Sequence, residues 1–245
     1  PDTNSLLLLY DDAQSIYSKK SQLDFSLSSV GVQARGRTKV LKLNYRNTDE
    51  ILAFSYGFAC RYLSPSEKDD DYVPLIAPEG AGRHGPKPVL KTFDSFDQEA
   101  AYIAHLLGRL HKEQGIAWSD MSVVYRSNWM GEKLKTALER AEVPVHYLGT
   151  AKAKKQLRLA ADSIKLMTMH SSKGLEFPVV AISGVGYMPA EKAEKTAEAK
   201  LLYVAMTRAT EKLLLTSHQE SEFFSQLLDA QAQQTSDERS EAPAN

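Results

Sequence analysis

The segment Ile164–Ser183 reads IKLMTMHSSKGLEFPVVAIS, in which two apolar runs enclose a polar loop. The two runs, Ile164–Thr168 and Val179–Ser183, have the length of buried strands. Along the rest of the chain, short apolar strands of this kind alternate with stretches of helical periodicity. This order predicts an α/β fold, in which a parallel sheet carries helices on both faces.

The expected elements follow from apolar period and from capping signals. The expected strands are Ser5–Tyr10, Val40–Leu43, Val89–Thr92, Ser122–Tyr125, Val145–Leu148, Ile164–Thr168, Val179–Ser183 and Lys212–Thr216. The expected helices are Thr48–Leu63, Ser95–Gln114, Asn128–Ala141 and Lys195–Ala209. Asn47 with Glu50, and Ser95 with Gln98, have the spacing of helix caps. Ser64–Pro88 and Gly184–Glu191 are expected to be loops, and the polar tail 219–245 to be largely disordered.

The composition is typical of a globular protein, with 42% apolar and 25% charged residues among 245. We expect one main domain at this length. No apolar run approaches the roughly 18 residues of a membrane span, so no membrane partner is expected. Cys60 is the single cysteine, which excludes an internal disulfide and favours a cytoplasmic location. The net charge of −1, taken by itself, argues against a nucleic-acid partner.

The segment DDAQSIY at 11–17 directly follows an expected strand. In a parallel sheet the carboxyl ends of strands face the ligand crevice, so Asp11, Asp12 and Gln14 would lie where a nucleotide or metal binds. The alternative is an Asx-type turn that simply ends the strand.

The segment LNYRNT at 43–48 lies between an expected strand and a helix start. Backbone N–H groups at a helix start attract phosphate, and Arg46 can add a charge-assisted hydrogen bond. Tyr45 offers a stacking surface. The alternative is a tyrosine packed on the core beside an exposed arginine.

The segment MTMHSSKGLEF at 167–177 is a strand followed by small and polar residues. Small hydroxyl side chains and Gly174 allow the backbone to approach a phosphodiester or a sugar closely. His170 and Lys173 can meet phosphate, and Glu176 can accept from a ribose hydroxyl. The alternative for His170 is a structural role.

The segment LLYVAMTRA at 201–209 has helical periodicity and places Arg208 within its apolar stripe. A charge on a packing face needs a partner. This position suits an arginine finger, which stabilises charge on a phosphoryl group held by another domain. The alternative is an arginine that stabilises the last helical turn.

A phosphate-binding loop is the feature that an ATPase needs and that this sequence does not show. Gly31–Thr38 nearly matches G-x-x-x-x-G-K-[ST], but arginine replaces the lysine and a strand, not a helix, follows. No strand ends in an Asp-Glu pair that would hold magnesium. We therefore expect no metal site in this chain, and no ATP hydrolysis by it alone.

Five short patterns in series carry a family resemblance. They are DDAQSIY at 11–17, NYRN at 44–47, YRSN at 125–128, HSSKGLEF at 170–177 and YVAMTRA at 203–209. Each is weak alone, but the series resembles the carboxy-terminal half of superfamily 1 DNA helicases related to UvrD, Rep and PcrA. The resemblance implies a RecA-like second motor domain.

The resemblance also implies roles for individual residues. Gln14, Arg46 and Arg208 would sense or stabilise the γ-phosphate of ATP. Tyr45 would stack on the adenine, and Glu176 would reach the ribose. ATP and Mg²⁺ would be held mainly by the first RecA-like domain of the same parent chain. The residues implied in contact with single-stranded DNA are Tyr17, Arg126, Asn128, Thr168 and His170.

Two departures from the family pattern change these expectations. Lys19-Lys20 stands where W-R is common, so Lys19 would attract a DNA phosphate in place of a base-stacking contact. The large subdomain that UvrD-like proteins insert between YRSN and HSSKGLEF is absent here. Because that subdomain is implicated in duplex contact, we expect translocation more firmly than unwinding.

The chain begins in an apolar run, Leu6–Leu9, and we expect it to be a fragment of a longer protein. The expected layout is the end of a first motor domain (1–20), a connecting segment (21–38), the second motor domain (39–218) and the tail.

The resemblance favours the C-terminal motor domain of an ATP-dependent DNA helicase or translocase, and it implies movement 3′-to-5′ on single-stranded DNA. The alternative is a catalytically inactive nucleic-acid-binding or protein-binding module with a helicase fold. Four nucleotide-facing groups argue against that alternative, because a scaffold has no chemical reason to keep them: Gln14, Arg46, Glu176 and Arg208. A motor that feeds a nuclease is a third class, but the sequence has no clear nuclease carboxylate cluster.

Overall fold

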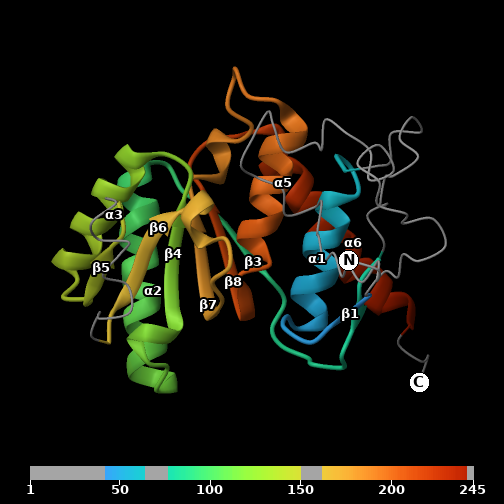
Figure 1. Cartoon of the computed structure of the whole chain (residues 1–245), viewed down its shortest axis with the longest axis horizontal. Coiled ribbons are helices and arrows are strands. Elements are labelled where there is room, and N and C mark those ends of the chain that lie inside the picture. Colours follow the sequence, from blue (N-terminus) through green and yellow to red (C-terminus); the bar gives the residue numbers. More distant parts are fainter. Residues whose placement is uncertain (1–41, 64–76, 150–161, 242–245) are drawn as a thin grey trace, which may run out of the picture.

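A six-stranded sheet forms the centre of the molecule (Figure 1). The computed structural model describes residues 42–63, 77–149 and 162–241, with side chains described as far as Ala232. Neighbouring strands of this sheet are all parallel, which confirms the predicted fold class. In sheet order the strands are β3 (Val89–Thr92), β8 (Ala209–Ser217), β7 (Phe177–Ser183), β4 (Met121–Tyr125), β6 (Ile164–Thr168) and β5 (Val145–Tyr147).

Two helices cover one face of the sheet (Figure 1). They are α2 (Phe96–Gln114), which follows β3, and α3 (Asn128–Arg140), which follows β4. Their apolar side chains pack against strand residues such as Met121 and Val123 of β4, whereas Val124 points into the core on the other face. A strand covered on both faces is mostly apolar, and this explains why β4 is buried at every position and has no alternation of polar residues.

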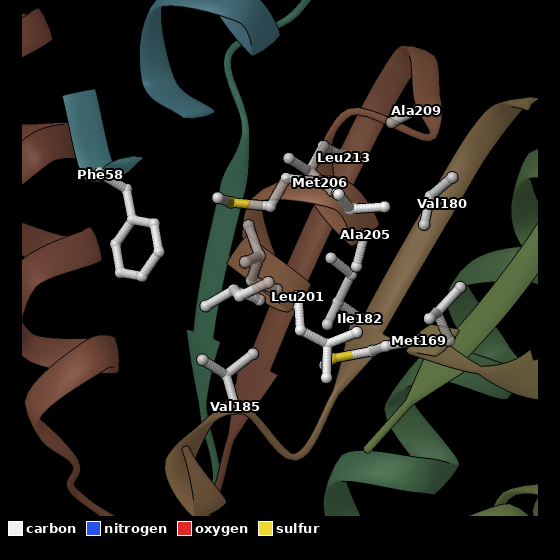
Figure 2. Close-up of a cluster of buried hydrophobic side chains, with 14 of the residues drawn as sticks. Phe58, Met169, Val180, Ile182, Val185, Leu201, Ala205, Met206, Ala209 and Leu213 are labelled. Atoms are coloured by element: carbon white, nitrogen blue, oxygen red, sulfur yellow. The ribbon is translucent and has the colours of Figure 1, made fainter. Parts of the chain in front are cut away.

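Three helices cover the opposite face: α1 (Asp49–Ala59), α5 (Lys195–Met206) and α6 (Glu222–Glu241) (Figure 1). Figure 2 shows the core between them and the sheet, where Leu201 of α5 lies against strand side chains such as Ile182 of β7. This core fixes α5, and therefore the turn that follows it, against the central strands.

One of the two predicted helix caps forms. Ser95 Oγ accepts a hydrogen bond of 3.3 Å from the Gln98 backbone N–H at the start of α2. The Asn47-Glu50 cap was wrong, because α1 begins after Thr48 without a side-chain cap. The side chains of Asn47 and Glu50 instead bond to backbone groups far along the chain.

The prediction of a largely disordered tail from Gln219 was wrong, because α6 occupies most of it. The helix is held by buried apolar side chains at helical spacing, namely Phe223, Phe224, Leu227 and Ala230. The polar composition beyond Leu228 concealed this anchor, because the packing contacts come from the first turns of the helix.

The helix predicted over Lys195–Ala209 ends earlier, at Met206, and places Arg208 in the turn before β8. The Phe177 N–H donates a hydrogen bond of 3.0 Å to the Arg208 carbonyl, which is the first link between β7 and the segment entering β8. Pairing with the sheet therefore takes the chain out of the helix before Arg208.

Of the strand predicted at Val40–Leu43, the structure describes Lys42 and Leu43, and the strand found there lies outside the main sheet. Within the described residues it is β1 (Leu43–Asn44), which pairs in parallel with β2 (Glu79–Gly80). The segment predicted as a loop, Ser64–Pro88, therefore contains a short strand. The connections that the structure describes include short 3-10 helices, namely η3 (Trp118–Asp120), η5 (Met169–Ser172) and η6 (Val185–Tyr187).

Candidate functional site

A cavity of about 370 Å³ lies at the amino ends of β7 and β8. Two of the predicted nucleotide-contacting segments meet there, because Tyr45 and Arg46 come from the loop before α1 and Glu176 directly precedes β7. The complete lining consists of Tyr45, Arg46, Arg83, Glu176, Phe177, Pro178 and Thr210. The cavity thus combines an exposed aromatic ring with two guanidinium groups and a carboxylate.

The two charged residues that were predicted to face a nucleotide are paired with each other. Arg46 Nε donates to the Glu176 carboxylate, and both side chains remain substantially exposed. Tyr45 beside them is 70% exposed, so the alternative of a tyrosine packed on the core was wrong. An exposed ring next to an exposed ion pair is able to meet a planar, charged ligand.

The loop that carries Tyr45 and Arg46 is held by two asparagines. Asn44 Oδ1 accepts hydrogen bonds from the backbone N–H groups of Arg46 (2.8 Å) and Asn47 (3.0 Å). The buried Asn47 amide donates to the carbonyls of Thr207 (3.0 Å) and Ala209 (2.6 Å), the residues on either side of Arg208. One buried side chain therefore joins the loop of the cavity to the turn that holds Arg208.

Arg83 is a cavity residue that the sequence did not suggest. Its Nη1 donates to the carbonyls of Arg46 (2.8 Å) and Tyr45 (3.3 Å), and its Nη2 lies 3.8 Å from Glu211. It belongs to the segment predicted as a loop, and the pairing of β2 with β1 and a hydrogen bond of 2.8 Å from the Asp49 N–H to the Arg83 carbonyl bring it to the site. No local pattern around Arg83 indicated this position.

Arg208 is buried, with 2% of its surface exposed, and it does not line the cavity. Its Nε donates to the Val204 carbonyl (2.9 Å) and its Nη1 to the Leu175 carbonyl (3.3 Å). The bond to Val204 satisfies a carbonyl in the last turn of α5, as the alternative interpretation of Arg208 expected. The bond to Leu175 places the guanidinium next to the segment that ends in Glu176.

The predicted DNA-contacting residues of two different segments meet at the opposite, carboxyl edge of the sheet. β4 and β6 are neighbours, and Tyr125 lies opposite Thr168 in their register. Arg126 and Asn128 follow β4, and His170 follows β6 within η5. Residues separated by about 40 positions in the sequence are therefore brought to one edge, as expected for parallel strands.

Hydrogen bonds within the protein already engage several of these side chains. Thr168 Oγ1 accepts from the Ser171 N–H (3.2 Å) and lies 2.7 Å from the Ser171 hydroxyl. Arg126 donates hydrogen bonds from Nε and Nη2 to the Glu198 carboxylate of α5, with nitrogen–oxygen distances of 2.8–3.1 Å. Sequence reasoning missed Glu198, and its only signal was an acid within a buried helical stripe. Asn128 is exposed in the first turn of α3.

A single short segment, 169–176, connects the two edges of the sheet. It leaves β6 at the carboxyl edge near His170 and enters β7 at the amino edge after Glu176. Gly174 lies within it with a φ of 82°, a conformation that favours glycine. Gly174 is exposed and is not part of the cavity lining, so a close approach of its backbone to a ligand stays a prediction.

Several predictions fall outside the described residues. These are the acidic segment at 11–17, with Gln14 and Tyr17, the position of Lys19, and the near match at Gly31–Thr38. In the described ranges, no group of three or more His, Cys, Asp or Glu side chains is arranged to hold a metal ion. Across the same ranges, no helix has both the length and the apolar character needed to span a membrane.

A profile of the UvrD-like helicase C-terminal domain matches residues 39–153 and 150–220. The chain belongs to this family. The match covers the loop of the cavity, both segments of the carboxyl edge and the turn of Arg208, and it stops before α6 begins.

Individual relatives of this UvrD-like domain are DNA helicases by name. The "Probable DNA helicase II homolog" of Mycoplasma capricolum is 26% identical over 199 residues, which is 80% of this chain and 26% of that protein. The ATP-dependent DNA helicase PcrA of Bacillus subtilis is 48% identical over 63 residues, 23% of this chain and 8% of PcrA. DNA helicase II of Escherichia coli is 47% identical over 62 residues, 22% of this chain and 9% of that protein.

The UvrD-like domain thus spans about a quarter or less of the length of these relatives. Among solved structures, the C-terminal domain of a "possible" DNA helicase from Lactobacillus plantarum WCFS1 matches with a TM-score of 0.49 and 19% identity. That match covers 75% of this chain and 94% of the other.

Proposed function

We propose that this UvrD-like domain is the second motor domain of an ATP-dependent DNA translocase or helicase that moves 3′-to-5′ on single-stranded DNA. In this proposal a first motor domain with a phosphate-binding loop completes the site. The observation that carries the proposal is the gathering of Tyr45, Arg46, Arg83 and Glu176 on one cavity. The names of the relatives support the class of reaction.

The side chains of the cavity fit the parts of an adenine nucleotide. The exposed ring of Tyr45 would stack on the base, and the Glu176 carboxylate would accept a hydrogen bond from a ribose hydroxyl. Arg46 and Arg83 would balance phosphate charge, and a phosphate oxygen would compete with Glu176 for Arg46. ATP supplies the phosphoryl group that is transferred to water. Mg²⁺ would be bound mainly by the first domain.

Arg208 is the residue that we propose as the arginine finger. Its Nη1 bond to the Leu175 carbonyl is long, at 3.3 Å, and a phosphoryl oxygen would be a stronger, charge-assisted acceptor. Asn47 holds the backbone on both sides of Arg208, so the guanidinium would be positioned before the two motor domains close. The finger would then stabilise the charge that develops during phosphoryl transfer.

We propose the carboxyl edge of β4 and β6 as this domain's share of the DNA groove. Arg126, Asn128, Thr168 and His170 would contact the strand there, through phosphates and sugars rather than through base edges. The segment 169–176 would transmit domain closure between DNA and nucleotide, because it touches both edges of the sheet. Alternating closure and release of the two motor domains would convert hydrolysis into steps along the strand.

Steady-state hydrolysis by the parent polypeptide tests the cavity. Tyr45→Ala is expected to raise the KM for ATP about tenfold, the order expected when one stacking contact is lost. Tyr45→Phe is the matched control, because it keeps the ring, and it should remain within about twofold of the wild type. A KM that is the same in Tyr45→Ala and the wild type would show that the cavity is not the nucleotide site.

A further inference from the structure

Four aromatic side chains form a closed cluster at the carboxyl edge of the sheet, beyond the predicted DNA-contacting residues. Phe96 begins α2, Trp129 lies in the first turn of α3, Tyr187 ends η6 and His218 directly follows β8. Each ring contacts two others, with centroid distances of 4.8 Å for Phe96–Trp129, 5.3 Å for Trp129–Tyr187, 5.2 Å for Tyr187–His218 and 5.6 Å for Phe96–His218. Four segments that are distant in sequence thus build one aromatic surface, which we call the aromatic platform.

A buried carboxylate fixes the base of the aromatic platform. Glu99 Oε2 lies 2.9 Å from His218 Nδ1, and His218 Nε2 lies 3.0 Å from the Tyr187 hydroxyl. The second oxygen, Oε1, accepts from the Ser183 hydroxyl (2.7 Å), the Gly184 N–H (2.6 Å) and the Thr216 hydroxyl (2.6 Å). The platform is therefore anchored to β7 and β8, so a ligand would meet it preorganised.

Trp129 is the exposed member of the platform, with 43% of its surface accessible. The indole plane makes angles of 57° with the ring of Phe96 and 79° with the ring of Tyr187, so neither neighbouring ring is stacked parallel on the indole. The other tryptophan, Trp118, differs: its ring is stacked on His111 at 3.9 Å and 20°. A planar ligand can therefore find an unstacked indole at Trp129 but not at Trp118.

The surroundings of Trp129 favour a nucleic-acid base over an apolar surface of a protein. Trp129 directly follows Asn128 in α3, and β4, which ends at Tyr125, brings Arg126 to the same edge. Thr168 lies opposite Tyr125 on the next strand. An exposed indole at the same edge of the sheet as amide, hydroxyl and guanidinium groups suits a site where a base stacks while its backbone is held by polar contacts.

We propose that the aromatic platform stacks one base of single-stranded DNA on Trp129. This inference rests on the proposed function and adds to it the residue that holds a base on this domain. Stacking does not depend on base identity, because every base has a π-face, so the platform would grip the strand without sequence preference. Tyr187, Phe96 and His218 position the indole, and the proposal assigns them no direct contact with DNA.

The two tryptophans lie at opposite ends of β4 and provide a built-in control, because Trp118 precedes the strand and Trp129 follows it. Trp118→Phe leaves Trp129 as the only fluorescent indole, and Trp129→Phe leaves Trp118. We expect an oligonucleotide of deoxythymidine to quench the emission of the first variant and to leave the second unchanged. An abasic oligonucleotide of equal length carries the same phosphates without bases, and it should quench neither.

Fluorescence anisotropy of a labelled deoxythymidine oligonucleotide bound to this chain of 245 residues measures how much the indole contributes to DNA affinity. Trp129→Leu, which keeps an apolar side chain against Phe96 and Tyr187, should weaken binding about fivefold or more. Trp129→Phe keeps a ring and should weaken it less. Thermal unfolding of both variants shows whether the fold is retained.

The outcomes separate this inference from the proposed function. Binding that is equal in Trp129→Leu and the wild type, with no quenching of Trp129, would overturn the stacking inference while leaving DNA binding intact; Trp129 would then be a contact for another protein domain. The absence of any oligonucleotide binding would overturn both this inference and the DNA part of the proposed function. Quenching of Trp129 by the abasic oligonucleotide would also contradict stacking.

Discussion

Arg126 and Glu198 form a bidentate ion pair, in which Nε and Nη2 of the arginine lie 2.8–3.1 Å from the carboxylate. The pair joins the end of β4 to α5 across 72 positions of sequence. Glu198 is almost fully buried, whereas the Arg126 side chain is 26% exposed. Removing Arg126 would therefore leave a charge that is buried, whereas removing Glu198 would leave a charge that water can reach.

This difference predicts unequal effects of two substitutions. Arg126→Met leaves a buried carboxylate without its cation and should lower the free energy of unfolding by about 3 kcal/mol. Glu198→Gln leaves an arginine that water can reach and should cost about 1 kcal/mol. Urea unfolding of both variants and of the double variant measures the coupling, and the double variant should be more stable than Arg126→Met alone. Equal losses in the two single variants would contradict the described burial.

Glu99 is expected to be required for stability, because its buried carboxylate accepts from four donors. Glu99→Gln replaces one acceptor oxygen with an amide donor, which must face at least one donor of the protein. We expect a loss of about 2 kcal/mol in the free energy of unfolding. Glu113→Gln, at an exposed position of the same helix, is the control and should change it by less than about 0.5 kcal/mol.

The packing of α6 predicts that substitutions at two of its apolar residues will change the free energy of unfolding by different amounts. Phe223 is fully buried and its ring lies 5.3 Å from Phe58 and 4.8 Å from Tyr62, whereas Leu228 is 43% exposed. Phe223→Ala should lower the free energy of unfolding by about 3–4 kcal/mol, and Leu228→Ala by less than about 1 kcal/mol. Similar small effects in both variants would indicate that α6 is not part of the packed domain.

Tyr62 gives the stability a dependence on alkaline pH. Burial, together with the negative charge of Glu222 and the hydrogen bond to it, raises the pKa of Tyr62 to about 12. Between pH 10 and about 12 the unfolded chain loses this proton while the folded chain keeps it, so stability falls as the pH rises through that window. Below pH 10 the contribution is fully present.

Tyr62→Phe has no hydroxyl to ionise, so its stability should decline less steeply than that of the wild type between pH 10 and 12. Urea unfolding at pH 8, 10 and 11.5 provides the comparison. At pH 8 the two proteins should differ only by the loss of the hydrogen bond to Glu222, about 1 kcal/mol or less. Parallel declines of the two proteins above pH 10 would contradict the pKa shift of Tyr62.

The sequence was sufficient for features that depend on local period. The strands at Val89–Thr92 and Ile164–Thr168 were predicted with their observed bounds, because both are short apolar runs between turn signals. The start of α2 followed from the capping spacing of Ser95 and Gln98. The family resemblance grouped Arg126 with Thr168 as DNA contacts, and the pairing of Tyr125 with Thr168 places both at one carboxyl edge.

Features that depend on contacts distant in sequence were not predictable. The end of α5 before Arg208 is set by pairing with β7, and the position of Arg83 by the pairing of β1 with β2. The anchor of α6 is a set of aromatic contacts to Phe58 of α1 and to Tyr62 in the turn after it, which the polar composition of the tail did not indicate. Trp129 had no signal at all, since its two ring partners, Phe96 and Tyr187, lie in two other segments.

DNA-stimulated ATP hydrolysis by the parent polypeptide tests the proposed role of Arg208 as an arginine finger, with Arg208→Ala compared to Arg109→Ala, an exposed arginine of α2. We expect Arg208→Ala to lower kcat by roughly 10³-fold or more, the order expected of an arginine finger. Arg109→Ala should match the wild type, and this chain alone should hydrolyse no ATP. Two results would contradict the proposed motor function: a parent polypeptide that hydrolyses no ATP, or an Arg208→Ala variant as active as the wild type. Either result would favour a binding module that has the helicase fold without its activity.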